Sequence, residues 1–202
     1  GAFPGWAMDG TEFDSRHRDE LSGISGFGTL HTGSSWPDGG SYHLVSMIHV
    51  LEHFTDPVAA LRGLAGIAAP GCLLVVQVPD WTLNPFVLAI ADHATHFTAA
   101  SLARIAREAG WSPIAGVARP VAKELTLVAR LGRLGQESHG WMTSGHEDEA
   151  ALLAGQLGWL SQVEDVARDA AAQGGPLGMF GTAIGATWLH GVIAERISFF
   201  VD

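Results

Sequence analysis

Apolar stretches of strand length alternate with amphipathic stretches of helix length through the first two-thirds of this chain. The clearest strand signals are Tyr42–Ile48 and Cys72–Val78, and the second is continuously apolar, as in strands buried on both faces of a parallel sheet. Between them, Asp56–Ala68 carries apolar residues at helical spacing, and Pro70-Gly71 marks a turn. The pattern predicts a strand–helix–strand unit, and with it an α/β fold.

Weaker signals extend the alternation on both sides of this unit. Strands are expected over residues 6–12, 26–31, 111–117 and 124–130, and helices over 15–22 and 98–109. Thr98 or Ser101 can cap the last of these helices, and Gly110 ends it. The order predicts a doubly wound, mostly parallel sheet within a first domain spanning residues 1–133.

A second unit is expected at residues 145–202, after a polar linker at Leu131–Gly145. Glu147–Gln173 has the apolar spacing of a long helix that can break near Gly155 or Gly158. A strand at 177–181, a helix at 182–194 and a strand at 197–201 then form a βαβ unit.

Composition narrows the classes of protein that the chain can represent. Apolar residues make up 47% of the 202 and charged residues 16%, which excludes general disorder. The net charge of −10, with scattered basic residues, argues against a nucleic-acid surface. Cys72 is the single cysteine, so no disulfide framework exists and a cytoplasmic location is expected. The longest apolar stretches are interrupted, so no membrane partner is expected.

A polar cluster follows the strand that ends at Ile48. Ligands of open α/β sheets sit at the carboxyl ends of strands, so His49, Glu52 and His53 stand where function is expected. The order His-x-x-Glu-His also matches an inverted zinc-peptidase signature, whose two histidines must share one helical face. Because the residues before His49 read as a strand, we expect no metal here, and we expect His53 to pack against the following helix.

Four segments, Tyr42–Pro57, Ala69–Asp80, His96–Leu102 and Glu108–Trp111, carry a family resemblance in their order and spacing. Together they resemble the motifs of class I S-adenosylmethionine-dependent methyltransferases of types 11 and 12, over roughly Gly5 to Arg130. The resemblance implies a Rossmann-like fold. His43 stands where the family carries an aspartate.

The resemblance also implies a binding site for S-adenosylmethionine. Glu12 would accept hydrogen bonds from the ribose hydroxyls, and the loop containing Gly33 and Ser34 would lie near the adenine. The implied cofactor-binding residues are Glu12, Gly33, Ser34, Ile48, His49 and Leu51. His49 and His96 are the candidate catalytic residues, as general bases for an acceptor that must lose a proton.

One family feature has no counterpart upstream of Trp6, the first strand with its glycine loop. In the family this strand is central in the sheet, and only glycine permits its close approach to the cofactor. We therefore expect an N-terminally truncated fragment that is inactive by itself and binds cofactor weakly or not at all. Its bare strand edges would recruit the Leu177–Asp202 unit or a second copy, giving a homodimer.

The glycines at 178, 181 and 185, with Asp202 beyond them, resemble the C-terminal Rossmann-like domain of sugar C-methyltransferases. Structural glycines and an independent nucleotide site are the alternatives at this position. The expected function is methyl transfer to a small-molecule acceptor, with a sugar or sugar nucleotide as the favoured class. The alternative is a non-catalytic Rossmann-like nucleotide-binding or assembly module.

Overall fold

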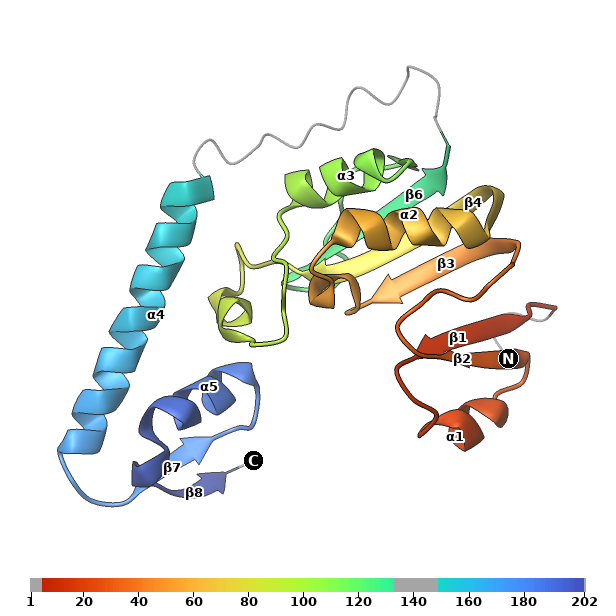
Figure 1. The fold of residues 1–202 in the computed structure, drawn as a ribbon. Helices are drawn as coiled ribbons and strands as arrows, with labels where there is room; N and C mark the ends of the chain where they lie inside the picture. Colours follow the sequence, from red (N-terminus) through yellow and green to blue (C-terminus); the bar gives the residue numbers. More distant parts are fainter. Residues whose placement is uncertain (1–4, 133–148, 202) are drawn as a thin grey trace.

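The computed structural model describes residues 5–132 and 149–201 (Figure 1). Its strands are β1 (Met8–Glu12), β2 (Phe27–Thr32), β3 (Tyr42–Ile48), β4 (Ala68–Pro79), β5 (Trp111–Pro113), β6 (Glu124–Leu131), β7 (Leu177–Phe180) and β8 (Ile197–Val201). Its α-helices are α1 (Arg18–Ser22), α2 (Pro57–Ile67), α3 (Ala99–Glu108), α4 (Glu149–Ala172) and α5 (Ile184–Ile193). Short 3-10 helices are η1 (Leu51–His53), η2 (Pro85–Ala89) and η4 (Ala194–Arg196). The predicted α/β class is confirmed.

The core is built on a four-stranded sheet in the order β3-β4-β6-β5. Strand β4 is parallel to β3 and antiparallel to β6, so the sheet is mixed. Its alternate side chains, Cys72, Leu74, Val76 and Val78, are fully buried. The continuous apolar run is therefore an interior strand as expected, but it is fully buried on one face alone, since Leu73, Val75 and Gln77 on the other face are only partly buried.

Helices α2 and α3 pack on one face of this sheet (Figure 1), and local signals fix where both begin. Asp56 caps α2, because its Oδ1 accepts the backbone N–H of Ala59 at 2.8 Å. Thr98 and Ser101 form a reciprocal capping box at the start of α3. Trp111 is fully buried between these helices and the sheet, and its indole N–H donates to the Leu61 carbonyl at 2.9 Å.

Strands β1 and β2 form a separate parallel pair rather than part of one doubly wound sheet. The hydroxyl of Tyr42, at the start of β3, donates to Asp9 Oδ2 at 2.7 Å and so ties the pair to the larger sheet. Among the described residues, β3 pairs with β4 alone. No described strand lies between β1 and β3, so the two strand edges that we expected to be bare have no partner among the described residues.

The C-terminal unit is the predicted strand–helix–strand arrangement, with β7 and β8 parallel to one another. Since β7 and β8 pair with each other, the Leu177–Asp202 unit does not fill the space beside β1 and β3, as we had expected within one chain. Helix α4 runs unbroken through Gly155 and Gly158. A helical glycine costs only about 1 kcal/mol, and Trp159 of α4 gains an edge-to-face contact with Phe86 of η2.

Two smaller expectations fall at element boundaries. The strand predicted to reach residue 117 ends at Pro113, and β6 extends through Leu131, the first residue of the predicted linker. The linker from residue 133 onward lies outside the described residues. In the described part of the chain, no helix is long and apolar enough to cross a bilayer.

Candidate functional site

His49 leaves the carboxyl end of β3 in a backbone conformation that is unusual for its type. Its φ is +53°, in the left-handed region that residues with a side chain seldom adopt. The backbone N–H still bonds the Gln77 carbonyl of β4 at 2.9 Å, so the chain turns out of the sheet abruptly after it. The imidazole is half exposed at this end of the sheet. Unusual backbone of this kind is concentrated at functional sites.

Glu52, in η1, is buried beside His49. The residue is 1% exposed, and neither carboxylate oxygen has a hydrogen-bond partner. His49 Nδ1 lies 3.4 Å from Glu52 Oε1, at the length of a loose ion pair. Burial raises the pKa of the Glu52 carboxyl, because the charged form loses its hydration. The site therefore holds a carboxylate that lacks the stabilisation a buried charge normally has.

Glu124 reaches the same place from the first residue of β6. The antiparallel register sets it opposite Pro79, the last residue of β4, and its Oε2 lies 3.6 Å from His49 Nε2. Burial raises the pKa of the Glu124 carboxyl, and the nearby charge of Glu52 raises it further. His49 thus lies between two carboxylates. The sequence did not single out Glu124, since only sheet pairing brings residue 124 to residue 49.

Asp80 shows how a buried acid is normally stabilised in this protein. It is completely buried, yet it accepts hydrogen bonds from the Thr82 hydroxyl at 2.6 Å and from Arg119 at 2.8 Å. The Arg119 guanidinium also forms an ion pair with it at 2.7 Å. Glu52 differs from Asp80 in that neither of its buried oxygens accepts a hydrogen bond, so the lack of hydrogen bonds is particular to this site.

Three histidines gather next to this pair of carboxylates. The ring centroids of His53 and His93 are 5.1 Å apart, and those of His93 and His96 are 6.3 Å apart. Burial lowers the pKa of both His93 and His96, so both favour the neutral form. The contacts between the three rings place the predicted His96 at the same end of the sheet as His49. The sequence analysis did not single out His93, although it stands three residues before His96, at the first histidine of the family pattern His-x-x-His-Phe-Thr.

The residues predicted to hold the cofactor differ in whether their side chains are accessible to a ligand. Glu12 ends β1 with an exposed side chain, and its carbonyl accepts the N–H of Gly33 at 3.0 Å. Gly33 has a φ of +118°, which suits glycine, and Ser34 beyond it is exposed. Ile48 is half exposed beside His49, whereas the Leu51 side chain belongs to the hydrophobic core. Leu51 can therefore meet a ligand only through its backbone.

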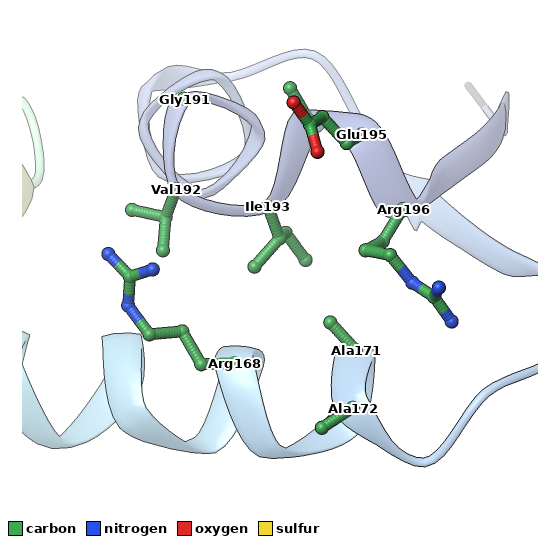
Figure 2. Close-up of a pocket in the computed structure, with 9 residues that line it drawn as sticks. Arg168, Ala171, Ala172, Gly191, Val192, Ile193, Glu195 and Arg196 are labelled. Atoms are coloured by element: carbon green, nitrogen blue, oxygen red, sulfur yellow. The ribbon is translucent and has the colours of Figure 1, made fainter.

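A cavity of about 600 Å³ lies elsewhere, in the C-terminal unit between α4 and the segment 191–196 (Figure 2). Arg168 reaches into it from α4, and Arg196 lies at its opposite end. The Arg168 guanidinium is already paired with Glu164 on its own helix. None of the predicted site residues lines this cavity, so it is separate from the strand-end site.

Residues 5–115, more than half of the chain, match the sequence model of a family described as a methyltransferase domain. The chain belongs to this family, and the resemblance to class I S-adenosylmethionine-dependent methyltransferases is confirmed. No curated protein matches the chain.

Solved structures show the same fold at low sequence identity. Mitomycin 7-O-methyltransferase MmcR superposes with a TM-score of 0.53 at 18% identity, covering 65% of this chain and 43% of that one. The O-methyltransferase NcsB1 from neocarzinostatin biosynthesis gives 0.51 at 20% identity, covering 63% and 42%. The 16S rRNA methyltransferase KamB gives 0.51 at 17%, covering 65% and 80%. The chain thus spans less than half the length of the two O-methyltransferases, and the likeness shows the fold alone.

Proposed function

We propose that this chain carries part of the cofactor and acceptor site of a methyltransferase acting on small molecules. S-adenosylmethionine is the cofactor of the class I family. The observation that carries the proposal is the convergence of His49, Glu52 and Glu124 where β3 and β4 end, the position at which open α/β sheets bind ligands.

Methyl transfer is an in-line displacement, so the protein contributes chiefly by holding acceptor and cofactor in reactive geometry. Glu12, Gly33, Ser34 and Ile48, with the backbone of Leu51, are the proposed cofactor contacts, and His49 borders both cofactor and acceptor. His96 is the second proposed acceptor contact. Glu12, Gly33, Ser34, Ile48 and His49 lie at or just after the ends of β1, β2 and β3, where they can meet a ligand.

A small acceptor is supported by the net charge of −10, which disfavours a polyanion such as RNA. The O-methyltransferase NcsB1 was solved with S-adenosylmethionine and a hydroxylated naphthoic acid, which shows that this fold accommodates such an acceptor. A sugar or sugar nucleotide stays our proposal for the acceptor. It rests on the C-terminal resemblance.

Within residues 5–132 and 149–201, one edge of β1 and one edge of β3 have no pairing strand, which supports a further part of the proposal. A parallel strand between them would complete one sheet, and without it we expect weak cofactor binding and no activity.

The proposed domains remain residues 1–133 and 145–202. A homodimer through the same edges is the alternative way to cover them. Light scattering on the purified chain distinguishes a monomer from a dimer.

Glu12→Ala tests the cofactor site, with Glu20→Ala on the exposed helix α1 as the matched control. Loss of a charged hydrogen-bond acceptor for the ribose should weaken binding of S-adenosylhomocysteine by about 1–3 kcal/mol. Because binding is expected to be weak, the dissociation constants are measured by NMR titration. Equal affinities for Glu12→Ala and the control would contradict the assignment of Glu12.

A further inference from the structure

Glu52, His53 and His93 each present one ligand atom to a common point. These atoms, one carboxylate oxygen and two imidazole nitrogens, all lie within 4.8 Å of one another. We propose that the three residues bind a divalent transition-metal ion, with Zn²⁺ as the preferred ion. This metal site is separate from the proposed methyltransferase function, since binding of the ion needs only these three side chains.

The carboxylate of Glu52 supplies the strongest reason for a cation. Both of its oxygens are buried and without a hydrogen-bond partner, whereas the equally buried Asp80 has partners for both oxygens. A buried carboxylate that makes no hydrogen bond and only a loose 3.4 Å contact with His49 is costly, and buried charges are normally well paired or coordinate metals. A metal ion at this point satisfies Glu52 directly.

The contacts of His53 fix which of its ring nitrogens can bind a metal ion. Its Nδ1 lies 3.0 Å from the backbone carbonyl of Asp92, which can only accept, so Nδ1 carries the proton. The Asp92 carboxylate lies 3.5 Å from the same nitrogen. Nε2 therefore keeps its lone pair for a metal, and a ligating histidine typically donates its other N–H to a carbonyl or carboxylate in this way.

The donor set indicates which ion fits. Two imidazoles and one carboxylate suit Zn²⁺ and its neighbours in the first transition row, whereas Mg²⁺ and Ca²⁺ prefer oxygen ligands. Tetrahedral ligands about 2.0–2.2 Å from Zn²⁺ are about 3.4 Å from one another, so atoms that lie within 4.8 Å must approach by up to about 1.4 Å. His53 is exposed and His93 only half-buried, which leaves both rings room to turn.

Three protein ligands leave a coordination position open, as in catalytic zinc sites. If the proposed methyl transfer holds, this position could take an oxygen of the acceptor beside His49, which contacts Glu52. The arrangement differs from the inverted zinc-peptidase signature, because His49 directly follows strand β3 and η1 is a single turn, so the two histidines do not share one helical face. The proposal differs from our expectation from sequence that no metal binds, because the third ligand, His93, lies forty residues beyond His53 in the chain.

The test is a titration of the untagged, chelator-treated chain with Co²⁺, whose visible absorption reports tetrahedral coordination, followed by Zn²⁺ competition. The unaltered chain should bind one ion per molecule and gain thermal stability from it. His93→Ala and His53→Ala should each weaken binding at least tenfold. His43→Ala, an exposed histidine on β3 outside the cluster, should bind as the unaltered chain does.

Melting curves of the metal-free variants show that each is folded. His53 is exposed and His93 is half-buried, so replacing either with alanine should leave the chain folded. These two variants therefore test the site even if a third variant, Glu52→Gln, fails to fold. Equal metal affinity in His93→Ala and the unaltered chain, or no binding at all, would overturn the site. Binding of Mg²⁺ in preference to Zn²⁺ would overturn the ligand assignment. The cofactor titration of Glu12→Ala is independent, so the two proposals fail separately.

Discussion

Replacing Tyr42 with phenylalanine removes one hydroxyl that ties the β1–β2 pair to the central sheet. The hydroxyl donates to Asp9 Oδ2 at 2.7 Å, while Asp9 Oδ1 accepts the Thr29 backbone N–H at 2.7 Å. A hydrogen bond to a charged group contributes about 1.5–3 kcal/mol when shielded from water. The Asp9 side chain is 30% exposed, so solvent competes, and we expect a loss of about 1 kcal/mol at pH 7.

The pH dependence of this loss identifies the interaction. The Tyr42 hydroxyl and the Thr29 N–H lower the pKa of Asp9 in the folded chain. The stabilisation of the folded state by ionised Asp9 is therefore complete above the pKa of the unfolded chain, about 3.9, and is lost as the pH falls through the lowered pKa. The hydrogen bond to Asp9 raises the pKa of Tyr42 to about 12, so its stabilisation is present below the unfolded value of about 10 and is lost as the pH rises through about 12.

Urea unfolding of the unaltered chain, Tyr42→Phe, Asp9→Ala and the double variant measures the coupling between the two side chains. We expect coupling of about 1 kcal/mol at pH 7 that shrinks as the pH falls below about 4. Additive effects at pH 7, or a cost of Tyr42→Phe that does not change on acidification, would refute this reasoning.

Substitutions on α2 and α3 test the packing that holds the site. Gly63→Ala on α2 places a Cβ against the indole of Trp36, which is stacked on Phe54, so we expect a loss of about 1–2 kcal/mol in the free energy of urea unfolding. The control Gly66→Ala, on the same helix, meets open space and should stabilise the chain by up to about 1 kcal/mol. Equal effects of the two substitutions would contradict this packing. Thr98→Ala removes the capping box of α3 and should cost about 1–2 kcal/mol. Unchanged stability of Thr98→Ala would show that the cap is dispensable.

Local signals made the central part of the fold predictable. The caps Asp56 and Thr98, the apolar run of β4 and the turn at Gly110 each act within a few residues, and each matched the structure to within one or two residues at the helix starts. β4 itself is longer than its apolar run, because pairing with β3 at Ala68 and with β6 at Pro79 extends it, so the Pro70-Gly71 pair lies inside the strand rather than in the expected turn.

Long-range pairing explains most of what the sequence did not reveal. Glu124 meets His49 only through the register of β4 against β6, and His93 meets His53 only because the loop after η2 returns to η1. The pairing of β7 with β8, rather than with β1 or β3, is likewise a matter of tertiary contacts that periodicity does not encode. His49 and His96 were found because they stand within family-like motifs.

The position of the cofactor is the central claim, and chemical-shift mapping tests it most directly. S-adenosylhomocysteine is titrated into the isotope-labelled chain while the backbone amide signals are followed. We expect weak binding, with shifts concentrated at Glu12, Gly33, Ser34 and His49, at the carboxyl ends of β1, β2 and β3. Shifts concentrated instead in the glycine turn after β7, with these strand ends unaffected, would contradict it.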